Sequence, residues 1–228
     1  PIYTRYLATD DKPALKESFL LATRFNVFFT TLTAGGLIVF GQEFITHWLD
    51  DSYLDAYRVL LVLLIATVYE VMQINSVNLI YALSKHKYYA YLGVIEAAAN
   101  LLLSLILVKN MGMMGVALGT ALPMLVNRLI ILPIYVCRCL QIPLKDYFKP
   151  LLQAHFSAIV IQIPVYFYFV TMHFANLAHL FIVAVPLYIL LAILILNIFT
   201  TTNEKEMLVS NIRPLRKVIY MPRRPSSI

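Results

Sequence analysis

The sequence predicts an all-α membrane protein that crosses the bilayer several times, and three properties lead to this prediction. Of 228 residues, 61% are hydrophobic and 13% are charged, whereas a soluble domain carries roughly 25% charged residues. The mean hydropathy is +0.77. The apolar residues form long runs, near the ~20 residues that cross a bilayer core as a helix, and no stretch alternates as membrane β-strands do. A water-soluble globule and a disordered chain are therefore excluded.

Six apolar runs, separated by polar segments, are expected to form a bundle of six transmembrane helices. The second and fourth runs are long enough to tilt or to project from the bilayer. Prolines inside three runs are expected to kink their helices and to free carbonyl groups that find other partners. The expected spans are Leu20–Phe40, Ala56–Leu83, Tyr88–Val108, Met114–Val136, Ala154–Met172 and Leu177–Phe199.

The basic residues orient these spans, because Lys and Arg collect on the cytoplasmic side of membrane proteins. They lie before the first span, after the second and fourth spans, and in the tail, whereas the opposite loops hold Lys109 and several carboxylates. The alternation predicts that both ends of the chain are cytoplasmic. The basic residues on that side are Arg5, Lys12, Lys16, Lys85, Lys87, Arg138, Lys145, Lys149, Lys205, Arg213, Arg216, Lys217, Arg223 and Arg224.

The two ends of the chain support two further expectations. The chain begins at Pro1 without a signal-peptide pattern, which favours a segment that starts inside a longer protein. The tail begins with a capping-box pattern, Asn203 followed by Glu206, and continues as a basic stretch. We expect this tail to touch anionic lipid, with a specific partner site as the alternative.

Polar side chains inside the first two spans are the first candidate functional residues, since a charge in lipid costs at least ~2.5 kcal/mol and usually faces a bundle interior or a watery cavity. The first span holds Arg24 and Asn26. Arg24 is about one turn inside, so snorkelling to the surface and lining of a pathway are both open. The second span holds Glu70, Gln73 and Asn78, roughly on one helical face. We expect this face to line a substrate or ion pathway, with helix cross-linking as the alternative.

The third and fourth spans carry a second set of polar residues, which are either structural or part of the pathway. Glu96 and Asn100 lie four residues apart on one face, which we expect to contact protein. Asn127 and Arg128 lie near the middle of the fourth span. An arginine at that depth requires a carboxylate, and Glu70 and Glu96 are the candidates. A structural ion pair and a cation that contacts an anion are both open.

Small residues mark two places where helices are expected to approach one another closely. Gly35–Gly36 lies near the end of the first span, and Ala97–Ala99 follows Glu96. A kink is the alternative for the glycine pair.

No pattern in the sequence predicts catalysis or metal binding. Cys137 and Cys139 lie two residues apart and fit neither a disulfide framework nor a zinc site. The five histidines lie at span ends or in loops without a ligand spacing, and no phosphate-binding or nucleophile-elbow motif occurs. We therefore expect no enzyme, no cofactor, no metal and no nucleic-acid partner.

The order of these features resembles the C-terminal part of the polysaccharide (O-antigen and oligosaccharide) flippases, in the superfamily of the MATE exporters. The opening PIYTRYLATDDKPALKESF and the loop FGQEFITHWLDDSYLDAYRVLLVL look like the corresponding segments of that family. The most specific stretch combines a short basic loop, Glu and Asn in one helix, and a glycine-rich turn into the next helix. Its residues are Lys85, Lys87, Glu96, Asn100, Gly112, Gly115, Ala117, Gly119 and Thr120.

The resemblance covers residues 1–147 and implies a two-lobe, MATE-like flippase that works by alternating access. Residues 1–147 would be four spans of the C-terminal lobe, 148–202 an additional helix pair and 203–228 a basic cytoplasmic tail. The partners would be membrane lipids, the missing N-terminal lobe and the substrate. That substrate would be an undecaprenyl-diphosphate-linked oligosaccharide, flipped across the bacterial inner membrane for surface polysaccharide biosynthesis with energy from an ion gradient or the membrane potential.

Two other functions are weighed against this one. A MATE-type exporter of cationic drugs predicts that Glu70 is unpaired and that no arginine reaches the cavity. A membrane glycosyltransferase or O-antigen ligase generally needs a sizeable periplasmic loop with catalytic polar residues, and none of the expected outer loops is long enough.

Overall fold

The computed structural model describes residues 2–169, 172 and 174–199, with side chains as far as residue 194. Every regular element in these residues is a helix, and they contain no strand, as the sequence predicts. The expected tail at 203–228 lies outside the described residues. The chain divides into two units, Pro1–Ile189 and Leu190–Ile228. The contacts described below belong to the first unit.

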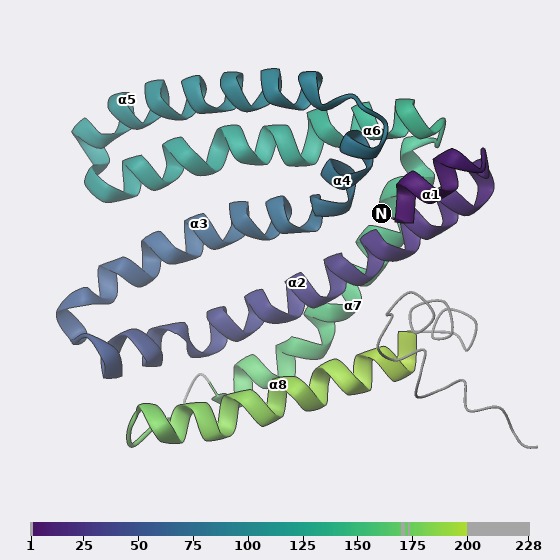
Figure 1. Cartoon of the computed structure of the whole chain (residues 1–228). Coiled ribbons are helices and arrows are strands. Elements are labelled where there is room, and N and C mark those ends of the chain that lie inside the picture. Colours follow the sequence, from purple (N-terminus) through teal and green to yellow (C-terminus); the bar gives the residue numbers. More distant parts are fainter. Residues whose placement is uncertain (1, 170–171, 173, 200–228) are drawn as a thin grey trace, which may run out of the picture. The chain divides into compact units, whose positions relative to one another are not determined.

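The helices follow the expected apolar runs, with extensions at several ends (Figure 1). Two short turns, the 3₁₀ turn η1 and the π-turn η2, interrupt them. The elements are α1 (Ile2–Ala8), α2 (Lys12–Trp48), η1 (Asp51–Tyr53), α3 (Leu54–Met72), α4 (Ile74–Ala82), α5 (His86–Val126), η2 (Asn127–Ile131), α6 (Leu132–Leu140), α7 (Leu144–Phe169) and α8 (Leu177–Phe199).

Five helical segments of the described residues are long and apolar enough to cross a membrane, and one of them contributes two of the six expected spans. This segment, His86–Leu140, is 55 residues long. It turns back at Gly112, whose φ of 55° and ψ of −134° are non-helical, and glycine adopts a positive φ without a steric penalty. Figure 1 shows the two antiparallel legs on either side of this turn. The other segments are Lys12–Trp48, Asp51–Ala82, Leu144–Phe169 and Leu177–Leu194.

Glycines on the second leg of α5 let the two legs touch. A Cβ on Gly115 would lie 2.4 Å from the carbonyl oxygen of Leu107, and one on Gly119 would lie 2.5 Å from the backbone nitrogen of Ser104. Both neighbours are backbone atoms, so any side chain at these positions would force the legs apart. The Thr120 hydroxyl on the second leg donates to Asn100 Oδ1 at 3.2 Å, which places the polar face of the first leg against protein, as expected.

The second expected span is broken rather than continuous. α3 ends at Met72 and α4 begins at Ile74, while Gln73 between them has φ −90° and ψ 4°. The prediction that Glu70, Gln73 and Asn78 share one face of one helix is therefore wrong. Gln73 is buried and Asn78 is exposed. The break sets α4 at an angle to α3 (Figure 1).

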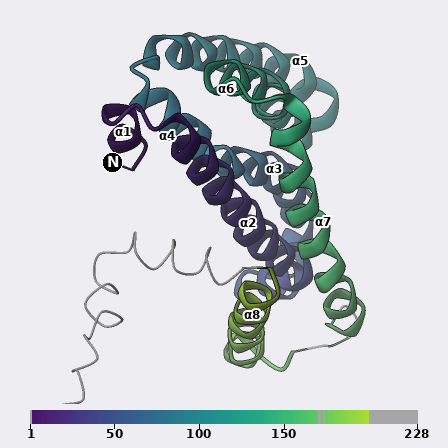
Figure 2. The same ribbon diagram turned by 90° about the vertical axis from the view of Figure 1, so that its right-hand side faces the viewer.

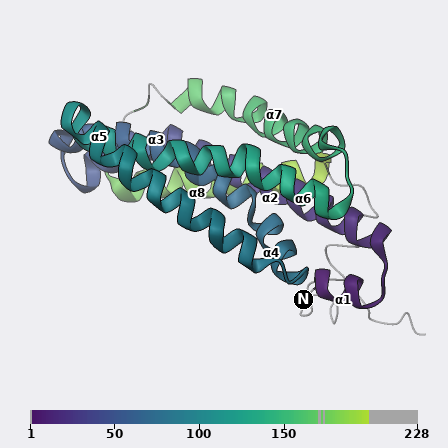
Figure 3. The ribbon, with the colours of Figure 1, turned by 90° about the horizontal axis from the view of Figure 1, so that it is seen from above.

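α2 is the helix around which its neighbours pack. It contacts α3 and α7 along its length, and it contacts α1 and α4 near its N-terminal end (Figures 2 and 3). α7 begins at Leu144, ten residues before the expected span, and its added turns bury Tyr147 against α2. The ring of Tyr147 stacks on that of Phe19, with a centroid separation of 6.1 Å.

Candidate functional site

A buried arginine joins two carboxylates that come from different helices. Arg128 Nη2 lies 2.9 Å from Glu70 Oε1 on α3, and Arg128 Nη1 lies 3.2 Å from Glu96 Oε2 on the first leg of α5. Asn127 Nδ2 donates a hydrogen bond to the same Glu96 oxygen. These four residues are called the arginine cluster below. The expectation that Arg128 pairs with a deep carboxylate is confirmed, and it takes both candidates rather than one.

The π-turn η2 explains why Arg128 lies where it does. The Leu132 N–H donates to the Asn127 carbonyl, five residues back. In that register the next donor to the Arg128 carbonyl would be Pro133, and proline has no N–H. The freed Arg128 carbonyl instead accepts a hydrogen bond from Gln73 Nε2 at 2.9 Å. The expectation that proline-freed carbonyls find other partners is confirmed at Pro133, and single π-turns often mark functional sites.

Gln73 also organises a second set of polar groups beside the arginine cluster. Its Oε1 accepts hydrogen bonds from Ser76 Oγ at 2.7 Å and from the Tyr147 hydroxyl at 2.9 Å. All three residues are buried. Tyr147 was not predicted as a site residue, because its segment was expected to be a loop. The available signal was Pro143, whose carbonyl accepts from the Tyr147 N–H at 3.2 Å and so starts the helix, a position near the first turn that proline favours.

The arginine cluster carries more negative than positive charge, and Glu70 is its most exposed member. With both carboxylates ionised, the two glutamates and one arginine give a formal charge of −1. The side chain of Glu70 is 41% exposed, against 18% for Glu96 and 6% for Arg128. The guanidinium also lies 5.8 Å from the ring centroid of Tyr89, within the range of a cation–π contact. Glu70 is therefore the group through which a solute would meet the cluster.

Two buried polar atoms of the cluster have no hydrogen-bond partner among the described residues. They are Asn127 Oδ1 and Arg128 Nε. Such atoms are rare in folded proteins, and here both belong to consecutive residues of the π-turn.

The other predicted pathway residues lie outside the cluster. Asn26 Nδ2 donates to the Val71 carbonyl at the end of α3 and so ties α2 to the break in the second span. Arg24 is half-buried on α2, and Asn78 is exposed on α4. Asn100 lies within the α5 hairpin, where it accepts from Ser104. Of the five residues assigned to a pathway, the structure brings together Glu70 and Gln73.

A largely apolar cavity of about 510 Å³ lies between α2, α3 and α7. Its polar lining includes Thr31 and His155, whose Oγ1 and Nδ1 are 2.8 Å apart, together with Tyr69 and Gln162. A Cβ on Gly35 would lie 1.3 Å from Gln162 Oε1. The expectation of a close helix contact at the glycine pair is therefore confirmed, and α2 passes through it as an unbroken helix.

The chain matches no known family model, no curated protein and no solved structure. Fold and site together define a class: an all-helical protein whose long apolar helices are compatible with a membrane bundle, and whose helices are joined by a buried ion cluster.

Proposed function

We propose that this chain is part of a transporter that flips undecaprenyl-diphosphate-linked oligosaccharide from the cytoplasmic to the periplasmic leaflet of the bacterial inner membrane. The supporting observation is the arginine cluster, in which a buried guanidinium lies 2.9 Å behind a half-exposed carboxylate. A diphosphate and sugar head group needs a polar and partly cationic path, while its lipid tail stays in hydrocarbon. Alternating access between two lobes supplies such a path.

In this proposal Glu70 meets the head group and Arg128 sets the charge behind it. The 2.9 Å contact between them offsets the negative charge of Glu70, so that an anion approaching this face is not repelled by an isolated carboxylate. Arg128 is held from the other side by Glu96 and by the carbonyl bond to Gln73. A guanidinium suits this position because it can contact several oxygens at once in fixed geometry.

The α5 hairpin adds support from the resemblance to the flippases. The glycine-rich stretch of that resemblance includes Gly112, which makes the turn, and Gly115 and Gly119, which let the legs touch. Glu96 and Asn100 belong to the same pattern and face the second leg, where Asn127 and Thr120 donate to them. These five residues of the resemblance therefore have a shared physical role in forming one tight helical hairpin.

A MATE-type exporter of cationic drugs is the second candidate. One observation favours it: the formal charge of −1 on the cluster, with Glu70 at 41% exposure, would attract a cation. That function, however, predicts an unpaired Glu70, and Glu70 is bound to Arg128. We therefore prefer the anionic-lipid substrate.

The test is complementation with the full-length protein in a strain that lacks its own copy. Variants with Glu70→Ala, Arg128→Ala or Arg24→Ala are scored for surface polysaccharide and for resistance to cationic drugs. We expect Glu70→Ala to lose polysaccharide, and Asn78→Ala, an exposed amide outside the cluster, to retain it. Undiminished polysaccharide in every well-expressed variant would refute the proposal. Drug sensitivity with intact polysaccharide would select the exporter.

A further inference from the structure

His47 links the last turn of α2 to the residues that precede α8. Its Nδ1 lies 2.8 Å from the Glu43 carbonyl oxygen, and its Nε2 lies 2.7 Å from the Phe174 carbonyl oxygen. Carbonyl oxygens only accept hydrogen bonds, and a neutral imidazole has one N–H whereas an imidazolium has two. Both contacts can therefore be hydrogen bonds at the same time only when the ring is protonated.

We propose that His47 is a proton-dependent latch, which holds Phe174 and the start of α8 against the end of α2 when its ring is charged. Loss of one proton leaves a ring nitrogen lone pair facing a carbonyl lone pair, so one of the two bonds is lost. This inference uses no residue of the arginine cluster and does not depend on the proposed function.

The groups around His47 favour the charged ring. Glu43 Oε2 lies 3.7 Å from Nδ1, and Asp51 of η1 adds negative charge. These negative charges favour the protonated ring, which the two carbonyl contacts require.

Among the described residues, the elements around His47 carry further charged or titratable groups, which include His179 on α8 and an ion pair on α3. His179 on α8 contacts the Phe174 ring with a centroid separation of 5.5 Å, which makes it the matched control. On α3, Asp55 and Arg58 pair with each other at 3.0 Å and are exposed.

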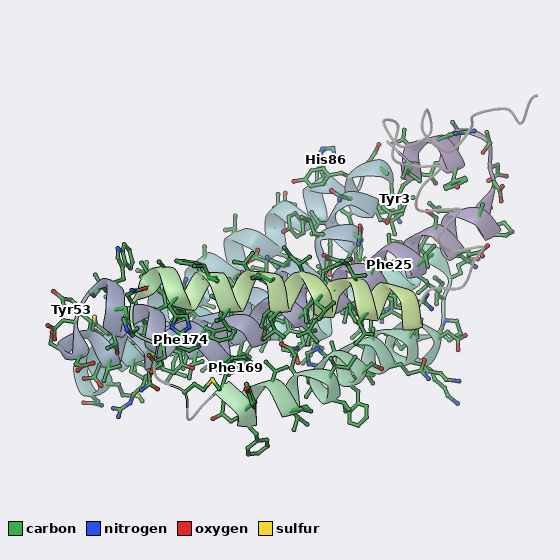
Figure 4. All side chains as sticks on the ribbon, turned by 90° about the horizontal axis from the view of Figure 1, so that it is seen from below. Tyr3, Phe25, Tyr53, His86, Phe169 and Phe174 are labelled. Carbon is green, nitrogen blue, oxygen red and sulfur yellow. The ribbon has the colours of Figure 1, made fainter. Side chains whose placement is uncertain are left out.

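Phe174, whose carbonyl His47 contacts, is anchored by its own buried ring. The hydrogen bond to this carbonyl therefore couples the end of α2 to the packing around Phe174. The Phe174 ring is 6% exposed and belongs to an apolar cluster with Phe40 and Leu180. Its centroid lies 5.8 Å from that of Phe40 and 6.4 Å from that of Phe169. Figure 4 shows Phe169 and Phe174 toward the end of the bundle that carries Tyr53.

The pH dependence of thermal stability tests the latch. Trp48 is the single tryptophan of the chain, follows His47 directly, and reports unfolding of this end by its fluorescence. Because only the charged ring makes both hydrogen bonds, the stabilisation is present at low pH and is lost as the pH rises and the ring loses its proton. We expect the melting temperature to fall by about 2–4 °C across that rise.

Two variants and one spectrum decide the outcome. His47→Gln should remove the pH-dependent step, whereas His179→Gln should keep it. A step that survives in His47→Gln, or that disappears in His179→Gln, overturns the proposal. Where His47→Gln does not fold, nitrogen NMR of the wild-type imidazole decides: both nitrogens should carry protons near pH 6, and a neutral tautomer there would equally overturn it.

Discussion

Two buried glutamines occupy similar surroundings, and they differ in the backbone carbonyl groups to which they donate. Gln73 donates to the Arg128 carbonyl at 2.9 Å and accepts from the Tyr147 hydroxyl at 2.9 Å. Gln162 donates to the Thr31 carbonyl at 3.2 Å and accepts from a tyrosine hydroxyl, Tyr188, at 3.4 Å. Both are nearly inaccessible, with exposures of 4% and 7%.

The difference lies in the carbonyl that each amide serves. The Arg128 carbonyl is freed by the π-turn and Pro133, so without Gln73 it would be buried and unsatisfied. The carbonyls beside Gln162, those of Thr31 and Ala158, lie in regular turns of α2 and α7, where backbone N–H groups already bond to them. An amide inside a helical bundle thus contributes most where the backbone lacks a partner of its own.

The largest expected effect comes from Arg128→Ala. It leaves Glu70 and Glu96 close together without their cation, and removal of one partner from a buried ion pair typically costs about 3–5 kcal/mol. The measurement is the free energy of unfolding in detergent. The matched control is Arg58→Ala, which removes an exposed arginine that pairs with Asp55 at 3.0 Å and should change stability by less than about 1 kcal/mol. Equal losses in the two variants would contradict the burial argument.

Gln73→Met comes next and separates the two glutamines directly. It keeps the side-chain length but leaves the Arg128 carbonyl without a partner and the Tyr147 hydroxyl with its 3.4 Å contact to Ser76 Oγ, so we expect a loss of about 2–3 kcal/mol. Gln162→Met, whose neighbouring carbonyls are already bonded, should lose less than about 1 kcal/mol. The same unfolding assay applies, and a larger loss at Gln162 would reverse the comparison.

Gly35→Ala is expected to have a smaller effect. The new methyl group would displace Gln162, whose Oε1 lies 1.3 Å from the Cβ position. Because that atom is the end of a flexible side chain, we expect a loss of about 1 kcal/mol, at the lower end for overpacking. Melting curves of Gly35→Ala, Gln162→Ala and the double variant form a cycle. The double variant should recover part of the Gly35→Ala loss, and strict additivity would show that the clash lies elsewhere.

The smallest expected effects come from removing the hydroxyl groups of the two tyrosines that bond to these glutamines, Tyr147 and Tyr188. Tyr147→Phe removes a 2.9 Å hydrogen bond and should cost about 1 kcal/mol, while Gln73 keeps its bond from Ser76. Tyr188→Phe removes a 3.4 Å contact and should cost less than about 0.5 kcal/mol, because interactions at that length are weak. Both losses are read from the unfolding midpoint, and a clear loss in Tyr188→Phe alone would oppose this ranking.

The sequence was sufficient to predict features that depend on local sequence or that have few possible partners. Apolar run lengths predicted the helices, and a deep Arg128 with Glu70 and Glu96 as its candidate partners predicted the ion pair. Gly35–Gly36 predicted a close contact, which the clash between a Cβ on Gly35 and Gln162 confirms.

The sequence was insufficient to predict features that depend on contacts between different helices. The break at Gln73 interrupts a run whose hydropathy is continuous, and its consequences include bonds to Arg128 and Tyr147 from distant parts of the chain. The π-turn was not predicted either. Pro133 predicts that a carbonyl group lacks a helical partner, but it does not predict the extra residue in the turn. Tyr147 was missed because a start signal for α7, Pro143, lies in a segment that also carries the basic residues of a loop.

The π-turn also sets the rotational phase of the helix that contains it. In a regular α-helix, deletion of one residue rotates everything beyond it by about 100°, which would turn Tyr135 away from Tyr88, now stacked at 3.8 Å. A π-turn holds one residue more than the α-turn it replaces. Deletion of the exposed Ile130 would therefore restore a regular turn and leave α6 facing as it does now. A chain one residue shorter here can keep the same packing while its sequence aligns out of register with this one.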